Sequence, residues 1–318
     1  MNTKGKQSML NIVLAKYGIL ISLLILIIFF AIQAPNFLSV RNITNLFRQI
    51  SILSLLSTGL TCCMILNEFD LSVGEVAGLS GVLVTSLMLS GYSFVFSIVI
   101  VLILGFLIGL VNGLIVVKLK IFSFIVTLAM SSIALGFNYF ISRGRPVYGQ
   151  FPNSFNIIGI GYVAGIPFPT IISIGVLIIG IVFTMKTKYG RYMYAIGGNI
   201  IAAKHSGINT DWYRIIVMGI SSLCAASGGI VLASRLGSGQ PTAGSGYLMN
   251  CFAACFLGTA IFSKKIPTLL GTFIGVIIIG ILSNGLTMIS IPYYYENIIK
   301  GVVLIAAVSL TIFQNNSK

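Results

Sequence analysis

Acidic and catalytic side chains are scarce in this chain of 318 residues. Five Asp and Glu residues stand against 19 Lys and Arg residues, and there is a single histidine, His205. The sequence contains no G-x-x-x-x-G-K-[ST] loop, so it cannot cradle the phosphates of ATP in that way. It also assembles no Ser-His-Asp set and no cluster of metal ligands. We therefore expect no catalytic residue, no cofactor and no metal, and any ATP must be handled by a partner.

Charged residues make up 8% of the chain and hydrophobic residues 57%, with a mean hydropathy of +1.06. This exceeds what a water-soluble core of this size can hide, and it predicts an all-α polytopic membrane protein. A transmembrane helix needs about 20 apolar residues. Five uncharged runs of that order are predicted spans: 17–34, 94–117, 121–142, 166–185 and 215–234. Five further spans are predicted at 49–66, 71–90, 247–263, 266–284 and 297–314.

The last two spans come from one apolar run that is too long for a single crossing. We divide it at Asn284-Gly285, where helix propensity drops, and let Pro292 open the return helix. About ten helices result, forming a single transmembrane domain over residues 1–318. With both termini in the cytoplasm, most Lys and Arg residues near the span ends also fall on that side, as the positive-inside rule requires. We expect a multi-pass protein of the bacterial cell membrane.

The net charge of +14 is scattered over short loops, which favours contact with lipid headgroups and argues against nucleic acid. The longest polar stretch, residues 186–214, holds seven of the ionisable side chains and is predicted to be a cytoplasmic loop. The five cysteines lie in apolar segments, where cysteine commonly acts as a small hydrophobe, and no disulfide framework is implied.

Three of the five acids, Glu68, Asp70 and Glu75, gather in residues 67–75, which the predicted topology places at a cytoplasmic re-entry. One interpretation is a solvated turn in which Asp70 or Ser72 caps the next helix. The other is an element at the end of a pore or at a partner contact, built from polar backbone at membrane depth. A cap explains one acid but not three, so both interpretations stay open.

Glycines inside the spans, such as Gly271 and Gly275, have the small-xxx-small spacing that lets helices approach closely. Asn112-Gly-Leu in the first half resembles Asn284-Gly-Leu in the second, which suggests two pseudo-symmetric halves with a path between them. Residues 236–247 read either as an external loop rich in turn formers or as a gate. As a gate they would present Gln240, Thr242 and Tyr247 to a polar, uncharged solute.

Four stretches, in order and spread over nearly the whole chain, resemble the ribose-type permease subunits of bacterial ABC importers for simple sugars. They are Asp70-Leu-Ser-Val-Gly74; Gly197-Gly-Asn199 with Ala202-Ala203 and Ser206-Gly-Ile208; Gln240-Pro-Thr-Ala-Gly-Ser-Gly-Tyr247 with Ala253-Ala254 and Leu257-Gly258; and Asn284-Gly-Leu286 before Lys300-Gly301. The chain departs from the family pattern at Glu68-Phe69, at Leu248 and Asn250, and at residues 261–265. Because of those departures, the sequence does not identify the transported sugar.

The resemblance implies a permease that moves a monosaccharide or a similar hydroxylated solute into the cytoplasm. It implies a second permease (homodimer or paralogous heterodimer), a cytoplasmic ATPase and an extracytoplasmic substrate-binding protein as partners. It also gives residues 186–214 the role of an ATPase-docking loop with a short helix starting near Asn199. The residues expected to carry this coupling are Gly197, Gly198, Asn199, Ala202, Ala203, Ser206 and Gly207.

Candidate residues of the substrate path follow from the same motifs. They are Asp70 and Ser72 at the inner end, Asn112 and Asn284 near the membrane, and Gln240, Thr242 and Tyr247 at the outer mouth. The alternative is an ion-coupled secondary transporter or a channel, in which Glu68, Asp70 or Glu75 would bind a coupling ion. Against it stand the scarcity of deeply placed acids and the long polar loop, which an uncoupled pore would not need.

Overall fold

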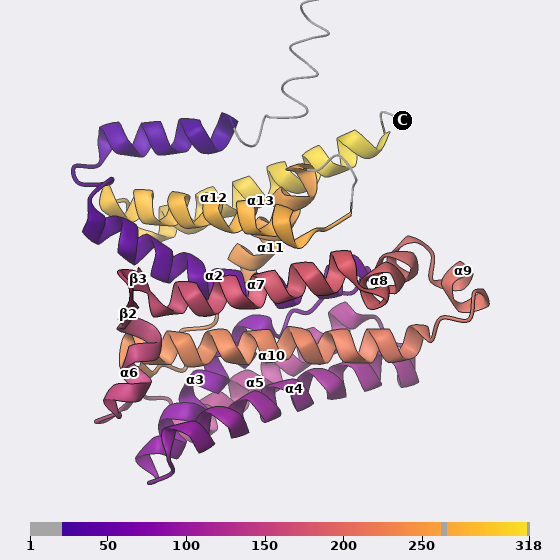
Figure 1. The fold of residues 1–318 in the computed structure, drawn as a ribbon, viewed down its shortest axis with the longest axis horizontal. Coiled ribbons are helices and arrows are strands. Elements are labelled where there is room, and N and C mark those ends of the chain that lie inside the picture. The colour runs from indigo at the N-terminus through magenta and orange to yellow at the C-terminus, as the bar shows by residue number, and fades with distance from the viewer. Residues whose placement is uncertain (1–20, 262–265, 317–318) are drawn as a thin grey trace, which may run out of the picture.

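The fold is a bundle of long helices, seen in a computed structural model that describes residues 21–261 and 266–316 (Figure 1). A helix over Ile21–Gln33 comes first. The long helices that follow are α2 (Val40–Ile65), α3 (Val73–Leu89), α4 (Phe94–Leu119), α5 (Ser123–Ser142), α7 (Phe168–Lys186), α10 (Thr210–Leu236), α11 (Tyr247–Ile261), α12 (Leu269–Met288) and α13 (Tyr293–Asn316). The short elements are β1 (Val147–Tyr148), α6 (Asn153–Ile160), β2 (Tyr162–Val163), β3 (Ile166–Pro167), α8 (Lys188–Gly198), α9 (Ile200–His205) and β4 (Ser238–Gly239).

Six of these helices, α2, α4, α5, α7, α10 and α12, are long and apolar enough to cross a membrane. Shorter apolar helices occupy Ile21–Gln33, Val73–Leu89 and Tyr247–Thr259. The apolar windows of α2, α10 and α12 are 72–78% buried, whereas those of α4 and α5 are 22% buried. The first three therefore form the interior, and α4 and α5 present apolar side chains outward, as a lipid-facing helix must. The predicted polytopic all-α class is confirmed at this level.

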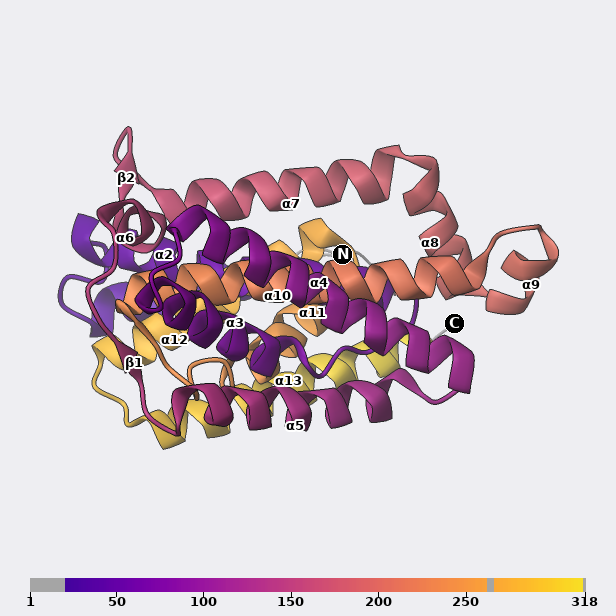
Figure 2. The same cartoon turned by 90° about the horizontal axis from the view of Figure 1, so that it is seen from below.

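The bundle has two distinct ends (Figure 2). We call one the α9 end, because α8 and α9 lie there together with the connection from α4 to α5. The other, the β1 end, carries α6, the β2–β3 hairpin and β1, which pairs with β4 antiparallel. Residues 1–20, 262–265 and 317–318, which include both termini and Lys264-Lys265, lie outside the described residues.

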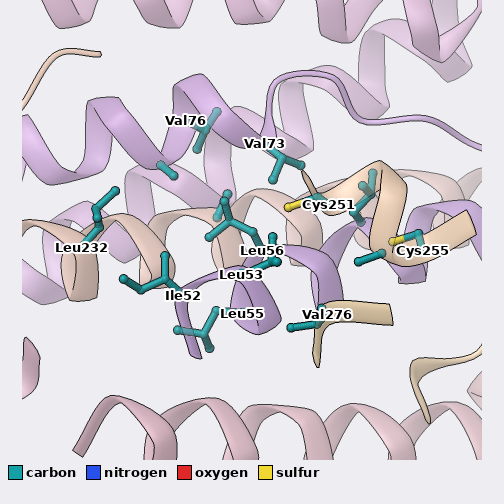
Figure 3. Close-up of a cluster of buried hydrophobic side chains, with 14 of the residues drawn as sticks. Ile52, Leu53, Leu55, Leu56, Val73, Val76, Leu232, Cys251, Cys255 and Val276 are labelled. Atoms are coloured by element: carbon teal, nitrogen blue, oxygen red, sulfur yellow. The ribbon is translucent and has the colours of Figure 1, made fainter. Parts of the chain in front are cut away.

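The core gathers side chains from five helices around α2 (Figure 3). Ile52, Leu55 and Leu56 of α2 are fully buried, and Cys251 and Cys255 of α11 lie among the same apolar side chains. All five cysteines are buried and unpaired, so they serve as small hydrophobes, as predicted. Outward-facing apolar residues cover the bundle, as is normal for a protein whose solvent is lipid.

Glycine brings two helix pairs into close contact, which confirms its predicted packing role. A Cβ atom on Gly109 of α4 would collide with the backbone of Met218 in α10. Similarly, a Cβ on Gly271 of α12 would meet the carbonyl of Gly258, and one on Gly275 would meet that of Ala254, both in α11. The missing side chains therefore let backbone pack on backbone.

The predicted helix break at Asn284-Gly285 is wrong, because α12 continues without interruption to Met288. Glycine in a helix interior costs about 1 kcal/mol relative to alanine, but here lateral contacts hold it in the helix. Gly285 lies against the ring of Phe30, and the amide of Asn284 is engaged by Asn42. The chain turns instead at 289–292, where Ser290 takes a φ of +59°, and Pro292 directly precedes α13, as predicted.

Candidate functional site

The segment between α2 and α3 carries two predicted path residues, and α4 places a third beside them. Asp70 is fully buried, and its Oδ1 accepts hydrogen bonds from the N–H of Ser72 at 3.0 Å and from the Ser72 hydroxyl at 2.5 Å. Asn112 of α4 donates to the Ser72 Oγ at 3.2 Å. The structure thus brings Asp70, Ser72 and Asn112 together, although 40 residues separate the last two.

Side chains of α5 satisfy the irregular backbone of this segment. The N–H of Phe69 donates to Ser123 Oγ at 3.0 Å, and the N–H of Leu71 donates to Thr127 Oγ1 at 3.0 Å. The Thr127 hydroxyl also lies 3.1 Å from the carbonyl of Phe69. Non-helical backbone within a bundle is tolerated only where protein groups pair it, and α5 provides that pairing.

The interpretation of residues 67–75 as a solvated turn that caps the next helix is wrong, because Asp70 is fully buried and no side chain caps the N–H groups of the first turn of α3. The Oδ1 of Asp70 instead holds Ser72, the residue before α3, through its N–H and its hydroxyl. The Oδ2 of Asp70 and the Oδ1 of Asn112 are both buried and have no hydrogen-bond partner among the described residues. The hydroxyl of Ser221 in α10, which is also buried and unpaired, lies close enough to interact with the Asp70 carboxylate, so a small rotation could pair these two groups.

Glu68 and Arg214 form an ion pair that the sequence analysis did not predict. Arg214 of α10 places its Nε 2.5 Å from Glu68 Oε1. Both residues line a cavity of about 570 Å³ at the α9 end, together with Lys120 and Ser123. The only sequence signal was one acid and one base predicted on the same side of the membrane, which is too common a pattern to pair them.

The segment after α10 is folded into the bundle. Gln240 donates to Ser238 Oγ at 3.2 Å, and the carbonyl of Pro241 accepts a 2.6 Å hydrogen bond from Asn138 of α5. Gly244 lies against the backbone of Gly74 in α3. Thr242 is exposed at the β1 end. These contacts disagree with a freely solvated loop and leave the gate interpretation in place.

Tyr247 lines a second cavity, of about 230 Å³, which is partly open and lies among α2, α11, α12 and α13. Polar side chains that sequence reasoning did not select surround it, namely Gln49, Asn250, Ser283, Asn297 and Lys300. They come from four helices and share no local motif, so only the tertiary fold reveals the set.

Asn284 does not join the other candidates. Its Nδ2 donates to Asn42 Oδ1 at 3.0 Å, and Asn42 Nδ2 donates to Asn284 Oδ1 at 2.9 Å. The two amides therefore satisfy each other and tie α12 to α2.

The loop 186–214 folds into α8 and α9, and α9 projects from the end of the bundle (Figure 2). Asn199 caps α9 by accepting from the N–H groups of Ile201 and Ala202, both at 3.0 Å. Gly197 lies against the carbonyl of Ile65, and its own carbonyl accepts from Asn67 Nδ2 at 2.5 Å. The start of the loop is thereby attached to the same segment that holds Asp70.

The predicted coupling residues face different ways. Ala202, Ser206 and Gly207 are exposed, and Gly198 has open space around it. Ala203 is 4% exposed and belongs to a buried cluster with Met193 of α8 and Tyr213 of α10. The helix therefore turns this methyl group toward its own protein, so Ala203 would act in coupling by holding α9 in place.

A family described as "Branched-chain amino acid transport system / permease component" matches residues 42–308. The chain belongs to this family. As a permease component it is a membrane protein that takes part in transport, and it is not an enzyme. The predicted family-level role is thus confirmed.

The curated relatives of this permease extend over nearly its full length. It is 38% identical to the ribose import permease protein of Bacillus subtilis (strain 168), over 98% of this chain and 97% of that protein. It is 37% identical to the ribose import permease protein of Escherichia coli (strain K12), over 91% of each. It is 32% identical to the galactose/methyl galactoside import permease protein of the same strain, over 98% and 97%. No solved structure matches the permease.

Proposed function

We propose that this permease is the membrane-spanning subunit of an ATP-binding-cassette importer that carries a monosaccharide or a similar small hydroxylated solute into the cytoplasm. The observation that carries the proposal is full-length similarity to import permeases whose names specify ribose and galactose, at 38% and 32% identity. D-allose and xylose permeases match as well, at 34% and 30%. Several pentoses and hexoses are thus candidates.

The proposed topology has ten spans with both termini in the cytoplasm. The α9 end would face the cytoplasm, since Lys118, Lys120, Lys186, Lys188 and Arg191 all lie at that end of the chain's helices, as the positive-inside rule favours. The proposed two-fold repeat rests on the Asn112 and Asn284 motifs, which occupy corresponding places in α4 and α12.

The proposed ATPase contact is the exposed side of α9. Ile201 is 66% exposed and Ile200 41% exposed on the helix that projects furthest from the bundle, which is typical of side chains that a partner covers. Asn199 fixes the start of this helix, and Gly198 and Gly207 on either side leave it free to tilt as a unit. Ile200 and Ile201 thus replace Ala203 as the side chains offered to the ATPase.

Movement of the ATPase would reach the path through two short links. The hydrogen bond from Asn67 to Gly197 joins α8 to the segment 66–72, and the Glu68–Arg214 ion pair joins α10 to it. Displacement of α9 would pull both links and shift the Asp70, Ser72 and Asn112 cluster. In alternating access, this cluster would act at the inner end of the path and Gln240, Thr242 and Tyr247 at the outer mouth.

The decisive experiment is reconstitution of the permease with an ATPase and a substrate-binding protein in proteoliposomes. Uptake of a labelled sugar from a panel of D-ribose, D-xylose, D-allose and D-galactose should require ATP in the ATPase compartment. An ion gradient that drives uptake without ATP would instead establish the ion-coupled carrier, for which the unpartnered Oδ2 of Asp70 is the supporting observation.

A further inference from the structure

The cavity of about 230 Å³ among α2, α11, α12 and α13 is a partly open space whose lining is more polar than that of the 570 Å³ cavity at the α9 end. Six of its lining side chains carry hydrogen-bonding groups: Gln49, Tyr247, Asn250, Ser283, Asn297 and Lys300. At about 30 Å³ for each water in the liquid, it has room for seven or eight waters or for one small solute. Of the polar lining residues, Ser283 is buried and Asn297 is exposed, so the cavity reaches from the protein interior to its surface.

The depth of this cavity within the bundle is given by the positions of its lining residues along two helices. Gln49 lies about 14 Å from the start of α2 and Lys300 about 10 Å from the start of α13, at the helical rise of 1.5 Å per residue. Both helices begin at the β1 end. The cavity is therefore two or three turns inside the bundle, on the side where the segment 240–247 enters.

One polar atom among the lining residues of the cavity lacks a partner in the part of the protein that the structure describes. The Oδ1 of Asn250 is buried and accepts no hydrogen bond from the described residues. Ser283 is 3% exposed. Its neighbour in sequence, Asn284, shows the contrast, because its amide is fully used by Asn42. Since buried polar groups in proteins are nearly always paired, the free acceptor of Asn250 calls for a donor that the protein itself does not supply.

The charge of the cavity lining limits which solute could supply the donor to Asn250. Lys300 Nζ lies 2.6 Å from Glu296 Oε1, so the single cation at the wall is already neutralised within α13. The remaining polar groups are amides and hydroxyls, which offer donors and acceptors without net charge. A phosphorylated or carboxylated solute would be left without a counter-charge, whereas a neutral polyol would match each group.

We propose that this cavity is a subsite for a neutral, hydroxyl-rich solute within one permease subunit, and that Asn250 and Ser283 bind the solute hydroxyls. The inference rests on the proposed import function and adds to it a place and a charge selectivity. It also gives a use to Lys300, which belongs to one of the resemblance motifs. Asn250 stands where the chain departs from the family pattern, so the subsite would tune this permease to its own sugar.

Direct access to the cavity is tested with the reconstituted importer carrying Asn250→Cys. The five native cysteines are buried and provide a low background. A small methanethiosulfonate reagent should react with this variant, and the transported sugar should slow the reaction, whereas D-ribose 5-phosphate should not. Ser97→Cys is the matched control, because Ser97 is fully buried in α4 away from the cavity, and it should not react.

Uptake by Asn250→Leu and Ser283→Ala gives a second readout. Loss of one hydrogen bond worth about 0.5–1.5 kcal/mol should lower uptake at limiting sugar about two- to tenfold. Ser97→Ala removes an equally buried hydroxyl and should match the wild type. Asn250→Gln, which keeps the amide, should retain more uptake than Asn250→Leu at equal protein level.

The outcomes separate the subsite from the import function. If the wild type takes up sugar with ATP but the cavity variants equal Ser97→Ala and sugar does not protect Asn250→Cys, the subsite is overturned and the import function stands. If anionic lipid and not sugar slows the labelling, the cavity binds lipid and the subsite is again overturned. If the wild type imports none of the four sugars, the proposed function fails and the subsite with it.

Discussion

Arg214 at the beginning of α10 donates through its Nε to Glu68 Oε1 at 2.5 Å, and this contact spans 146 residues of sequence. The side chains are 21% and 10% exposed, so neither charge is fully solvated. The pair fastens the segment that holds Asp70 to the helix that leaves the polar loop. It occurs where the chain has Glu68 in place of the family's commoner residue, so we interpret it as a link particular to this permease.

Glu68→Gln should loosen this link. The change leaves Arg214 without its counter-charge, and we expect a loss of about 1–2 kcal/mol, since a charged hydrogen bond is worth more than a neutral one but part of the pair is exposed. Thermal unfolding in detergent and the ratio of sugar imported to ATP hydrolysed would both be measured. The exchanged pair Glu68→Arg with Arg214→Glu should restore stability; a double variant as unstable as the sum of its parts would contradict the link.

Asp70→Asn should separate the hydrogen bonds to Ser72 from the charge of the carboxylate. The asparagine keeps an oxygen that can accept from Ser72, so the start of α3 and the protein level should be retained. Asp70→Leu removes the acceptor as well, and it should cost about 1 kcal/mol more. If transport falls with Asp70→Asn while thermal unfolding is unchanged, the charge of Asp70 has a role in the path. Normal transport by Asp70→Asn would leave Asp70 with the hydrogen bonds to Ser72 alone.

Gly109→Ala should disturb the contact between α4 and α10. Its new Cβ would collide with the carbonyl of Met218, so the helices must separate, at a cost of about 1–3 kcal/mol typical of overpacking. Gly136→Ala in α5 is the matched control, because nothing lies within 4 Å of the built Cβ. There the higher helix propensity of alanine should stabilise by up to about 1 kcal/mol. The measurement is the thermal unfolding temperature of both variants in detergent. Equal shifts of this temperature would contradict the close contact between α4 and α10.

Sequence patterns predicted local features well. Apolar runs located the long helices, the spacing of Gly271 and Gly275 predicted a close helix contact, and Asn199 stands at the helix start where it was expected. These features depend on neighbours within a turn or two of one helix. The motif Asp70-Leu-Ser-Val-Gly74 also grouped Asp70 with Ser72, and the structure joins the two by hydrogen bonds.

Features that depend on contacts between helices were missed. The drop in propensity at Asn284-Gly285 is real, but Asn42 and Phe30 from other helices outweigh it, and no property of the segment itself reveals them. Similarly, Gln49 and Lys300 line the same cavity although they are about 250 residues apart in sequence. No rule based on sequence spacing connects two such positions.

The direction of Ala203 changes how the docking proposal must be tested. A tryptophan at this position would have to displace Ile65 and Met193, so Ala203→Trp should unfold the loop locally, and a loss of ATPase binding would then have a trivial cause. Ile201→Glu changes a side chain that is 66% exposed, and it should leave thermal unfolding within about 0.5 kcal/mol of the wild type. It should nevertheless abolish capture of the ATPase in a pull-down, because a carboxylate would be buried in an apolar contact. Lys204→Ala, an exposed neighbour on α9, serves as the control for a change of charge alone. Normal ATPase capture by Ile201→Glu would place the contact elsewhere on the permease, whereas loss of capture with an unchanged unfolding temperature can only arise from the outer surface of α9.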